Sequence, residues 1–280
     1  MIPSVLSDAV VLGVLGLLVG SFLNVVIHRL PRMMERQWAA ECAEFAGKSV
    51  EPAEPLSLVR PRSRCPHCGH QIRWFENVPV ASYLVLRGRC SACRKPISAR
   101  YPTVEIVTAG LFAFCGWKWG LGGTALAWSG FAAALLALAL IDWDTQLLPD
   151  DITLPLVWAG LVAAAMRWTG LPLSQAVWGA VVGYLSLWLI YHAFKLLTGK
   201  EGMGYGDFKL FAALGAWFGW QALVPMILMA SLIGAVVGIG MKMRDRLGEG
   251  GAMPFGPFLA GAGLTALIVG PAALLEAVGL

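Results

Sequence analysis

The chain has 280 residues, of which 58% are hydrophobic and only 14% are charged. This balance excludes an ordinary water-soluble domain and is typical of helical membrane proteins. The formal net charge of +4 says little as a total, because in such proteins the distribution of positive charge carries the information. We expect a lipid bilayer around the chain and no nucleic-acid partner.

An uncharged apolar run covers residues 9–27, and it is long enough to cross a hydrocarbon core about 30 Å thick. Shorter and longer apolar runs recur from Thr103 onward, separated by Gly, Pro and charged turns. Together they predict an all-α polytopic membrane protein with about eight transmembrane helices. The run at 208–219 is too short for an upright span, so we expect a tilted or partial helix whose start is buried in protein. The later runs cover roughly 103–117, 124–142, 152–169, 173–197, 208–219, 221–241 and 255–278.

Residues 29–101 form the one sizeable water-soluble segment, and they hold more than half of the 21 Lys and Arg. Placing this segment in the cytoplasm, and alternating sides along the apolar runs, leaves only Lys118 and Arg167 outside. We therefore divide the chain into a first transmembrane helix (1–28), a cytoplasmic loop domain (29–101) and a multi-helix membrane domain (102–280). The start of the loop, about 35–55, is rich in Glu, Ala and Pro and is interpreted as a helical or poorly ordered insertion.

The loop contains two Cys-x-x-Cys pairs, Cys65 with Cys68 and Cys90 with Cys93. Two such pairs present four thiolates tetrahedrally, which suits a structural Zn²⁺ ion. Disulfides are the alternative, which a reducing cytoplasm disfavours. A zinc ion would fold a small loop that has little core of its own, so we predict a zinc knuckle domain.

Two aspartate-containing stretches, 141–151 and 204–209, each lie beside a long apolar run. Carboxylates next to lipid-facing helices are costly unless they are paired, hydrated or functional. The charge distribution puts both stretches on the cytoplasmic side, so Asp142 and Asp207 are predicted to meet there and hydrolyse a peptide bond. Because Asp142 ends a helix and Asp207 begins one, the helix dipoles favour Asp142 as the protonated acid and Asp207 as the ionised base.

The residues around this pair leave alternatives open. Gly204 and Gly206 allow positive φ and close approach of another backbone, although Gly-x-Gly-Asp by itself also fits a plain interhelical turn. Asp144, two residues from Asp142, is the alternative first catalytic acid or a supporting residue. Asp150 and Asp151 are interpreted as helix-capping residues.

Polar residues also lie inside the first spans. Ser21, Asn24 and His28 share one helical face, where they line a chamber or form polar contacts between helices. Glu105, near the start of the second span, contacts a substrate amine or forms an interfacial ion pair.

Taken together, these motifs resemble the bacterial type IV prepilin peptidases, a family of Gly-x-Gly-Asp membrane aspartyl proteases. Each motif alone is weakly specific, whereas their order and spacing along nearly the whole chain are specific, and the matched catalytic positions show no departure. The matching segments are 20–31 (GSFLNVVIHRLP), both cysteine pairs, 88–90 (GRC), 100–105 (RYPTVE), 142–150 and 204–209.

The resemblance implies more than the residues do by themselves. Family members remove the basic leader peptide from type IV prepilins and type II secretion pseudopilins at the cytoplasmic face of the inner membrane. Many then methylate the new N-terminal residue with S-adenosylmethionine. By resemblance, the catalytic pair is Asp142 and Asp207, the four cysteines are the zinc ligands, and Gly88 is linked to methyl transfer.

Two rival interpretations come from other protein classes. A proton- or cation-coupled transporter would use the same aspartates as ligands, but transporters usually have repeated halves and place such residues near the midplane. The sequence has no clear repeat. A zinc-dependent sensor or scaffold would use the cysteine loop as a binding module.

Overall fold

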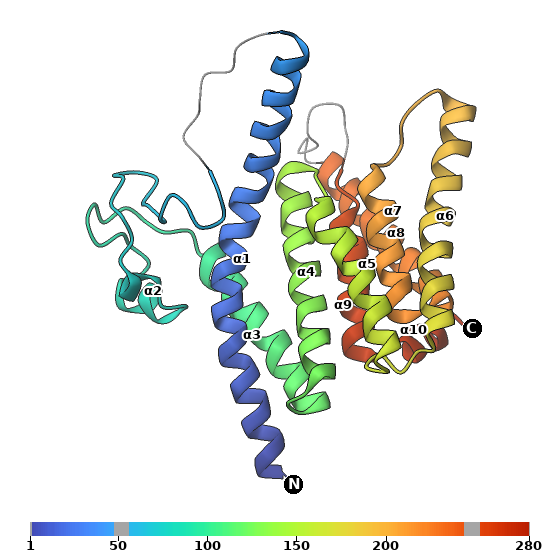
Figure 1. Cartoon of the computed structure of the whole chain (residues 1–280), viewed down its shortest axis with the longest axis horizontal. Helices are drawn as coiled ribbons and strands as arrows, with labels where there is room; N and C mark the ends of the chain where they lie inside the picture. The colour runs from blue at the N-terminus through green and yellow to red at the C-terminus, as the bar shows by residue number, and fades with distance from the viewer. Residues whose placement is uncertain (1, 48–55, 244–252, 280) are drawn as a thin grey trace. The chain divides into compact units, whose positions relative to one another are not determined.

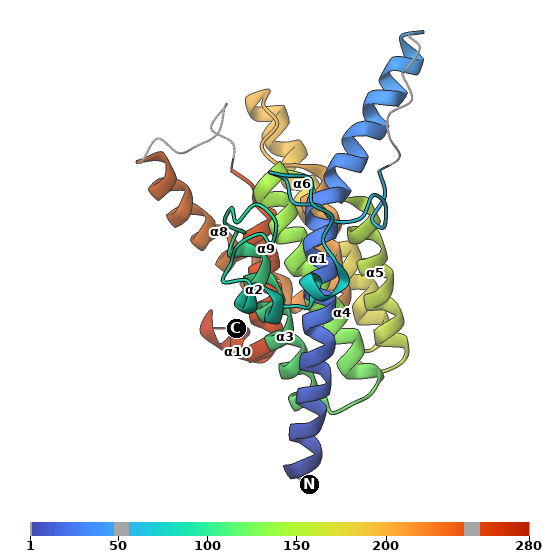
Figure 2. The same cartoon turned by 90° about the vertical axis from the view of Figure 1, so that its left-hand side faces the viewer.

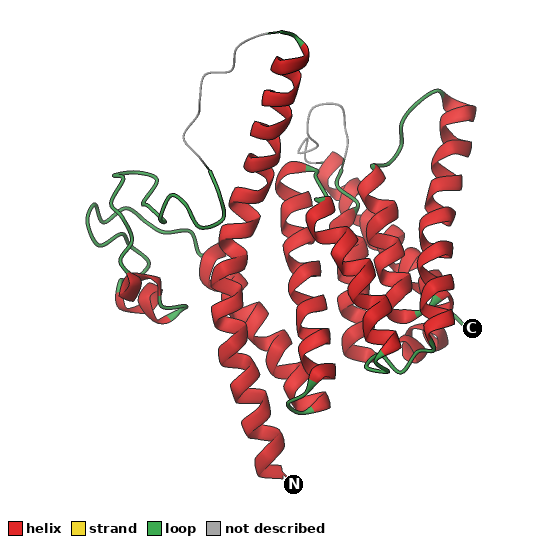
Figure 3. Cartoon of the chain, viewed as in Figure 1, coloured by secondary structure: helices red, strands yellow, loops and turns green. Residues whose placement is uncertain are grey.

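The computed structural model describes residues 2–47, 56–243 and 253–279. All regular elements in these ranges are helices (Figure 3), and β-structure is limited to two isolated bridges, Arg64 with Gln71 and Arg89 with Pro96. The chain divides into two compact units, Met1–Ala125 and Leu126–Leu280. The all-α prediction is therefore confirmed for the described residues.

The first unit is built on two long helices, α1 (Ile2–Phe45) and α3 (Arg100–Trp119). The segment between them carries only a 3-10 turn, η1 (Trp74–Asn77), and the short helix α2 (Ala81–Val85). This segment has few large apolar residues, so it forms little regular structure and cannot be stabilised by a hydrophobic core of its own.

Helix α1 is longer than the predicted span. It passes Pro31 and continues to Phe45, so the start of the hydrophilic segment is helical. The predicted poorly ordered part falls partly on residues 48–55, which lie outside the described residues. The length of the apolar run therefore predicts the candidate span within α1 but not where α1 ends. The helix continues beyond the run because good helix formers such as Glu, Ala and Arg follow it.

Helices α1 and α3 pack directly on one another (Figures 1 and 2). The contact is close enough that a Cβ at Gly20 would lie 2.7 Å from Cα of Glu105. Small residues permit such close approach between helices whose surroundings offer no hydrophobic driving force.

The second unit contains the remaining helices. Helices α5 and α6 pack against α7, which lies between them in Figure 1 and also contacts α8 and α9. The bounds are α4 (Gly123–Thr145), α5 (Asp150–Ala165), α6 (Leu173–Thr198), α7 (Tyr205–Phe218), α8 (Trp220–Lys242), α9 (Gly256–Val269) and α10 (Pro271–Ala277).

Helix α7 is the core of this unit. It has only 14 residues, about 21 Å at 1.5 Å per residue, and almost every side chain from Asp207 onward is buried. Trp217 donates its indole N–H to the carbonyl of Leu156 at 2.9 Å and packs on Phe131, with ring centroids 4.7 Å apart. A helix that is apolar on all sides belongs in a protein interior. The prediction of a short helix with a buried start is confirmed.

The crossing of α6 and α7 depends on two glycines. A Cβ at Gly179 would collide with the carbonyl oxygen of Gly215, and a Cβ at Gly215 would collide with that of Gly179. Glycine at both positions lets the two backbones touch, which fixes α7 against α6.

The last predicted run, 255–278, is not one helix. The chain bends by 108° at Gly270, between α9 and α10. Gly270 has φ +90°, a conformation that glycine adopts without steric penalty, and Pro271 cannot continue the preceding helix.

By length and composition, four helices of the described residues can cross a membrane, namely α1, α4, α6 and α8. The bent pair α9 and α10 raises the number to five if it counts as one span. These helices support a polytopic membrane protein.

Candidate functional site

Asp142 lies in the last turn of α4 and is 5% exposed. Its neighbour Ile141 is fully buried, so this end of α4 lies inside the second unit and the Asp142 carboxyl group is buried with it. Oδ2 of Asp142 accepts a hydrogen bond of 2.9 Å from the backbone N–H of Gly256, at the start of α9. This contact fixes the orientation of the carboxyl group.

Asp207 lies in the first turn of α7 and is 6% exposed. Its Oδ1 is buried and has no hydrogen-bond partner among the described residues. The carboxyl group of Asp142 is close enough to interact with it electrostatically. Two carboxyl groups from separate helices are therefore buried within electrostatic reach of each other.

Leu148, in the connection between α4 and α5, holds the two halves of this site together. A Cβ at Gly206 would lie 2.6 Å from Cβ of Leu148, and a Cβ at Gly256 would lie 3.1 Å from its Cδ2. The glycine before Asp207 thus makes room for a side chain. Neither glycine adopts the positive φ that its residue type allows, since Gly204 has φ −80° and Gly206 lies inside α7.

The other acidic residues of the first stretch lie nearer the surface. Asp144 is exposed, in contrast to Asp142. Asp150 accepts hydrogen bonds from Nζ of Lys209 at 2.6 and 2.7 Å, which joins the start of α5 to the start of α7. The capping interpretation is wrong for Asp150 and Asp151, because Pro149 is the N-cap of α5 and makes no side-chain cap.

The four predicted ligand cysteines gather in the first unit, and their Sγ atoms all lie within 4.8 Å of one another. The Sγ atoms of Cys65 and Cys93 are 3.9 Å apart, and those of Cys68 and Cys90 are 4.0 Å apart. Zn–S bonds of about 2.3 Å in a tetrahedron give S···S distances of about 3.8 Å. The geometry fits a metal ion, and none of these cysteines forms a disulfide.

The two knuckles have similar backbones. The N–H of Cys65 donates to the carbonyl of His70, and that of Cys90 donates to the carbonyl of Lys95, both at 2.9 Å. Outside the ligand set, His70 Nε2 lies 3.2 Å from Oε2 of Glu76. The pKa of Glu76 is lowered to about 2, first by a hydrogen bond from the backbone of Arg73 and then by one from Ser91. Glu76 is therefore ionised, and its hydrogen bonds stabilise the chain beside the first knuckle.

Gly88 precedes the second knuckle and has φ +66°. A Cβ at this position would lie 2.9 Å from the hydroxyl oxygen of Tyr83. Gly88 also donates its N–H to the carbonyl of Tyr83 at 2.8 Å. A side chain at Gly88 would therefore displace the Tyr83 ring.

Sequence reasoning missed Gly256 and Leu148. Neither is a residue type that takes part in acid–base chemistry, so a search for titratable side chains passes over them. The one available signal is the segment Pro254-Phe255-Gly256-Pro257, where two prolines bracket a glycine just before an apolar run.

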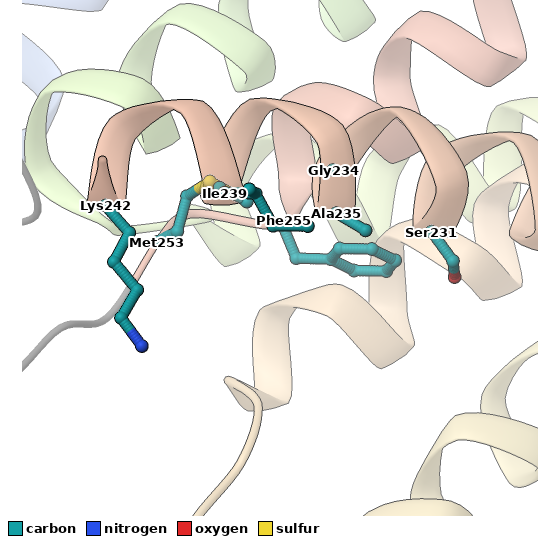
Figure 4. A pocket seen from close by; sticks show the side chains of 8 residues that line it. Ser231, Gly234, Ala235, Ile239, Lys242, Met253 and Phe255 are labelled. Carbon is teal, nitrogen blue, oxygen red and sulfur yellow. The ribbon is translucent and has the colours of Figure 1, made fainter. Parts of the chain in front are cut away.

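A shallow groove of about 430 Å³ runs along α8 in the second unit (Figure 4). One wall is a face of α8 that includes Gly234, Gly238 and Lys242, and the other is formed by Met253 and Phe255. Phe255 directly precedes Gly256, the residue that donates to Asp142, but neither Gly256 nor Asp142 lines the groove.

The fold and site define a helical membrane protein with a buried aspartate pair and a four-cysteine cluster. Residues 14–119 match the family description "Bacterial Peptidase A24 N-terminal domain", and residues 129–239 match "Type IV leader peptidase family". The chain belongs to the type IV leader peptidase family.

Curated relatives agree with this membership. The "Prepilin leader peptidase/N-methyltransferase" of Stutzerimonas stutzeri is 54% identical over 258 residues, which are 92% of this chain and 89% of the relative. Relatives with the same name from Pseudomonas putida and Pseudomonas aeruginosa are 55% and 54% identical, over 92% and 91% of this chain and 89% and 88% of their own lengths. No solved structure shows a significant match to this chain.

Proposed function

We propose that this protein is a membrane aspartic endopeptidase that removes the leader peptide from type IV prepilins and type II secretion pseudopilins. It then methylates the new N-terminal residue, as the name of its relatives states for them. The observation that carries the peptidase activity is the pairing of Asp142 and Asp207 in one buried site. The transporter alternative has no support, because the relatives are named for peptide cleavage and methylation.

The aspartate pair supplies the acid and the base of hydrolysis. One ionised carboxyl group takes a proton from a water molecule, and the neutral one protonates the carbonyl of the scissile bond. The two groups titrate as a pair, and burial keeps their electrostatic coupling strong. Gly256 orients Asp142, while Oδ1 of Asp207 is buried and lacks a protein partner among the described residues. Asp144 remains the alternative first acid, and its exposure favours a supporting role.

The protein would lie in the inner membrane with about eight spans, and its catalytic site would face the cytoplasm. The candidate spans α1, α4, α6 and α8 and the bent pair α9 and α10 would account for five of these. The shorter or more buried helices α3, α5 and α7 would be the other three. The loop domain at 29–101 lies in the cytoplasm, and residues 102–280 form the peptidase domain. The positive-inside distribution of Lys and Arg supports this orientation.

The groove on α8 is where the apolar stem of the substrate would lie. It offers small residues for close helix contact and includes Phe255, which directly precedes the residue that binds Asp142. A substrate helix in this groove would bring its terminal peptide to the aspartates, near the water–membrane interface.

The cysteine cluster would hold Zn²⁺ through Cys65, Cys68, Cys90 and Cys93. The distances between their sulfurs fit a tetrahedral ion, and four thiolates fill its coordination shell. The ion therefore stabilises the loop and takes no part in hydrolysis.

S-adenosylmethionine supplies the methyl group for the second activity. The sequence has no recognisable glycine-rich fingerprint for this donor, and no described residue is assigned to hold it. Gly88 is the one position linked to methyl transfer by family resemblance, and its contact with Tyr83 gives it a structural role.

Mass spectrometry of a purified prepilin incubated with the enzyme tests both activities. We expect a product without its leader, and a further mass increase of one methyl group only when S-adenosylmethionine is present. An intact prepilin with the native enzyme, under conditions where a curated relative cleaves it, would refute the peptidase assignment.

A further inference from the structure

The first unit contains a cavity of about 620 Å³ that is partly open to solvent, outside the aspartate site. Its walls are one face of α1, the start of α3 and both cysteine knuckles. Ser21, Asn24 and His28 line this cavity, and so does Glu105. Asn24 also donates to the carbonyl of Tyr101 at 3.1 Å, which is a polar contact between helices.

The cavity is strongly basic. Only two acidic residues, Glu76 and Glu105, share its walls with six cationic ones. Both carboxylates are already engaged: Glu76 accepts the N–H of Arg73 at 2.8 Å, and Glu105 accepts the N–H of Val80 at 2.7 Å. The cationic residues are Arg29, Arg32, Arg36, Arg62, Arg64 and Lys95.

Protein contacts leave much of this charge uncompensated. Arg29 donates to the carbonyl of Ser57 at 2.9 Å, and Arg32 contacts His28 at 2.8 Å, so neither of these contacts is with a carboxylate. Arg62, Arg64 and Lys95 form no ion pair with a carboxylate of the described residues. Like charges around one cavity repel each other more strongly than they would in bulk water. An anion in the cavity would remove this repulsion.

The cavity also has an apolar side. Val25 lies inside the uncharged run of α1, whereas Arg32 and Arg36 lie beyond its end, and all three line the cavity. Pro102, at the start of α3, contributes another apolar surface. The cavity therefore spans the level at which α1 leaves the hydrocarbon. A ligand that combines a phosphate with an apolar chain matches both halves.

We propose that this cavity binds the phosphate-bearing headgroup of an anionic phospholipid. Basic pockets beside transmembrane helices bind such headgroups through the same charge chemistry. The proposal rests on the membrane location given above and not on peptide cleavage. Because the cations come from α1, from the chain before the first knuckle and from the second knuckle, one headgroup would tie the cysteine domain to α1.

The experiment uses the full-length, metal-loaded protein in nanodiscs of phosphatidylcholine, with or without phosphatidylglycerol. Native mass spectrometry counts the lipids retained after transfer from the bilayer. The test variant is Arg32→Gln with Arg62→Gln, and the matched control is Arg87→Gln with Arg94→Gln. Both pairs remove two positive charges, but Arg87 and Arg94 are exposed residues that do not line the cavity. Zinc content is measured in both variants to show that the knuckles are intact.

We expect the native protein and the control to retain phosphatidylglycerol in preference to phosphatidylcholine. The test variant should bind it at least about tenfold more weakly, since each interfacial cation contributes severalfold to anionic-lipid affinity. Equal retention by the two variants would overturn the assignment of this cavity.

Two further arms separate other ligands from a lipid. If inorganic phosphate displaces phosphatidylglycerol at equal concentration, the site recognises the free anion and the lipid assignment fails. If S-adenosylmethionine displaces it, the cavity belongs to the methyl donor and the lipid assignment fails too. Prepilin cleavage is not a readout in any arm, so a failure of the proposed function is distinguishable from a failure of this inference.

Discussion

Gly256 donates its backbone N–H to Oδ2 of Asp142 across 114 positions of the chain. The approach is so close that a Cβ on Gly256 would lie 2.6 Å from the same oxygen. Glycine is therefore required at this position for space around the carboxyl group and not for a positive φ. The start of α9 is in this way part of the candidate catalytic site.

Substitution Gly256→Ala should abolish or strongly reduce prepilin cleavage. The added methyl group must push the Asp142 carboxyl group aside, and misplacing a catalytic group by about 1 Å can cost 100-fold in rate. The control is Gly261→Ala on the same helix, where a Cβ meets nothing within 4 Å. Cleavage rates of the two variants, compared at equal folded protein in membranes, make the measurement. Full activity of Gly256→Ala would show that this contact is dispensable.

The aspartates themselves give the second prediction. Asp142→Asn and Asp207→Asn should each lower the cleavage rate by at least about 100-fold, because each removes one partner of the acid–base pair. Asp144→Asn should retain most of the rate, because this side chain is exposed. The assay is prepilin cleavage followed by mass spectrometry. A result in which only Asp144→Asn is inactive would move the first acid from Asp142 to Asp144.

Several parts of the fold could be predicted because local pattern determines them. Apolar runs gave the positions of α3 to α8 within a few residues, and the two Cys-x-x-Cys pairs gave the metal-type cluster. The bend at Gly270 was missed, because apolar content changes little there, and the continuation of α1 to Phe45 was one of two alternatives, because apolar content does not govern it. Local helix propensity extends α1 to Phe45, and Gly270 permits the bend between α9 and α10.

The site was predictable in its titratable residues but not in its packing. Charge distribution placed Asp142 and Asp207 on one side of the membrane, whereas the contacts of Leu148 and Gly256 depend on tertiary structure alone. Asp150 illustrates the same limit, because its position before an apolar run suggested a cap and its actual partner is 59 residues away.

Helix dipoles assigned the shared proton to Asp142, but the hydrogen bond that Gly256 donates to Asp142 opposes that assignment, since it favours an ionised carboxylate there. Infrared spectra of isotope-labelled carboxyl groups decide which residue holds the proton.

The pairing of Lys209 with Asp150 should stabilise the junction of α5 and α7 modestly. Asp150 is 53% exposed at its side chain, so solvent screens the pair, and a coupling of about 0.2–1 kcal/mol is expected. A double-mutant cycle with Asp150→Asn and Lys209→Met, read from unfolding in detergent, measures it. A coupling near zero would assign this ion pair no role in stability.

Removal of the metal should unfold the cysteine knuckles and leave the second unit folded. The double variant Cys65→Ser and Cys90→Ser should lose its zinc, whereas Cys42→Ser should keep it, because Cys42 is exposed on α1 and outside the cluster. Metal analysis and limited proteolysis of the loop report the two outcomes. Structural zinc in isolated fingers contributes about 10–16 kcal/mol to folding, so the loop should become protease-sensitive. Unchanged zinc content in the double variant would exclude this ligand set.

The last prediction separates the two activities at Gly88. Gly88→Ala should reduce methyl transfer while leaving cleavage intact, because family resemblance links Gly88 to methyl transfer and its Cβ would lie 2.9 Å from the Tyr83 hydroxyl and displace that ring. Gly69→Ala is the matched control, since Gly69 also has positive φ, at +71°, but its Cβ would meet nothing within 4 Å. Both variants carry similar backbone strain, about 1 kcal/mol, so only the collision distinguishes them. The ratio of methylated to unmethylated cleaved pilin, measured by mass spectrometry, should fall for Gly88→Ala alone. Equal loss in both variants would assign the effect to backbone strain in the loop, and recovery of methylation in Gly88→Ala combined with Tyr83→Ala would assign it to the ring.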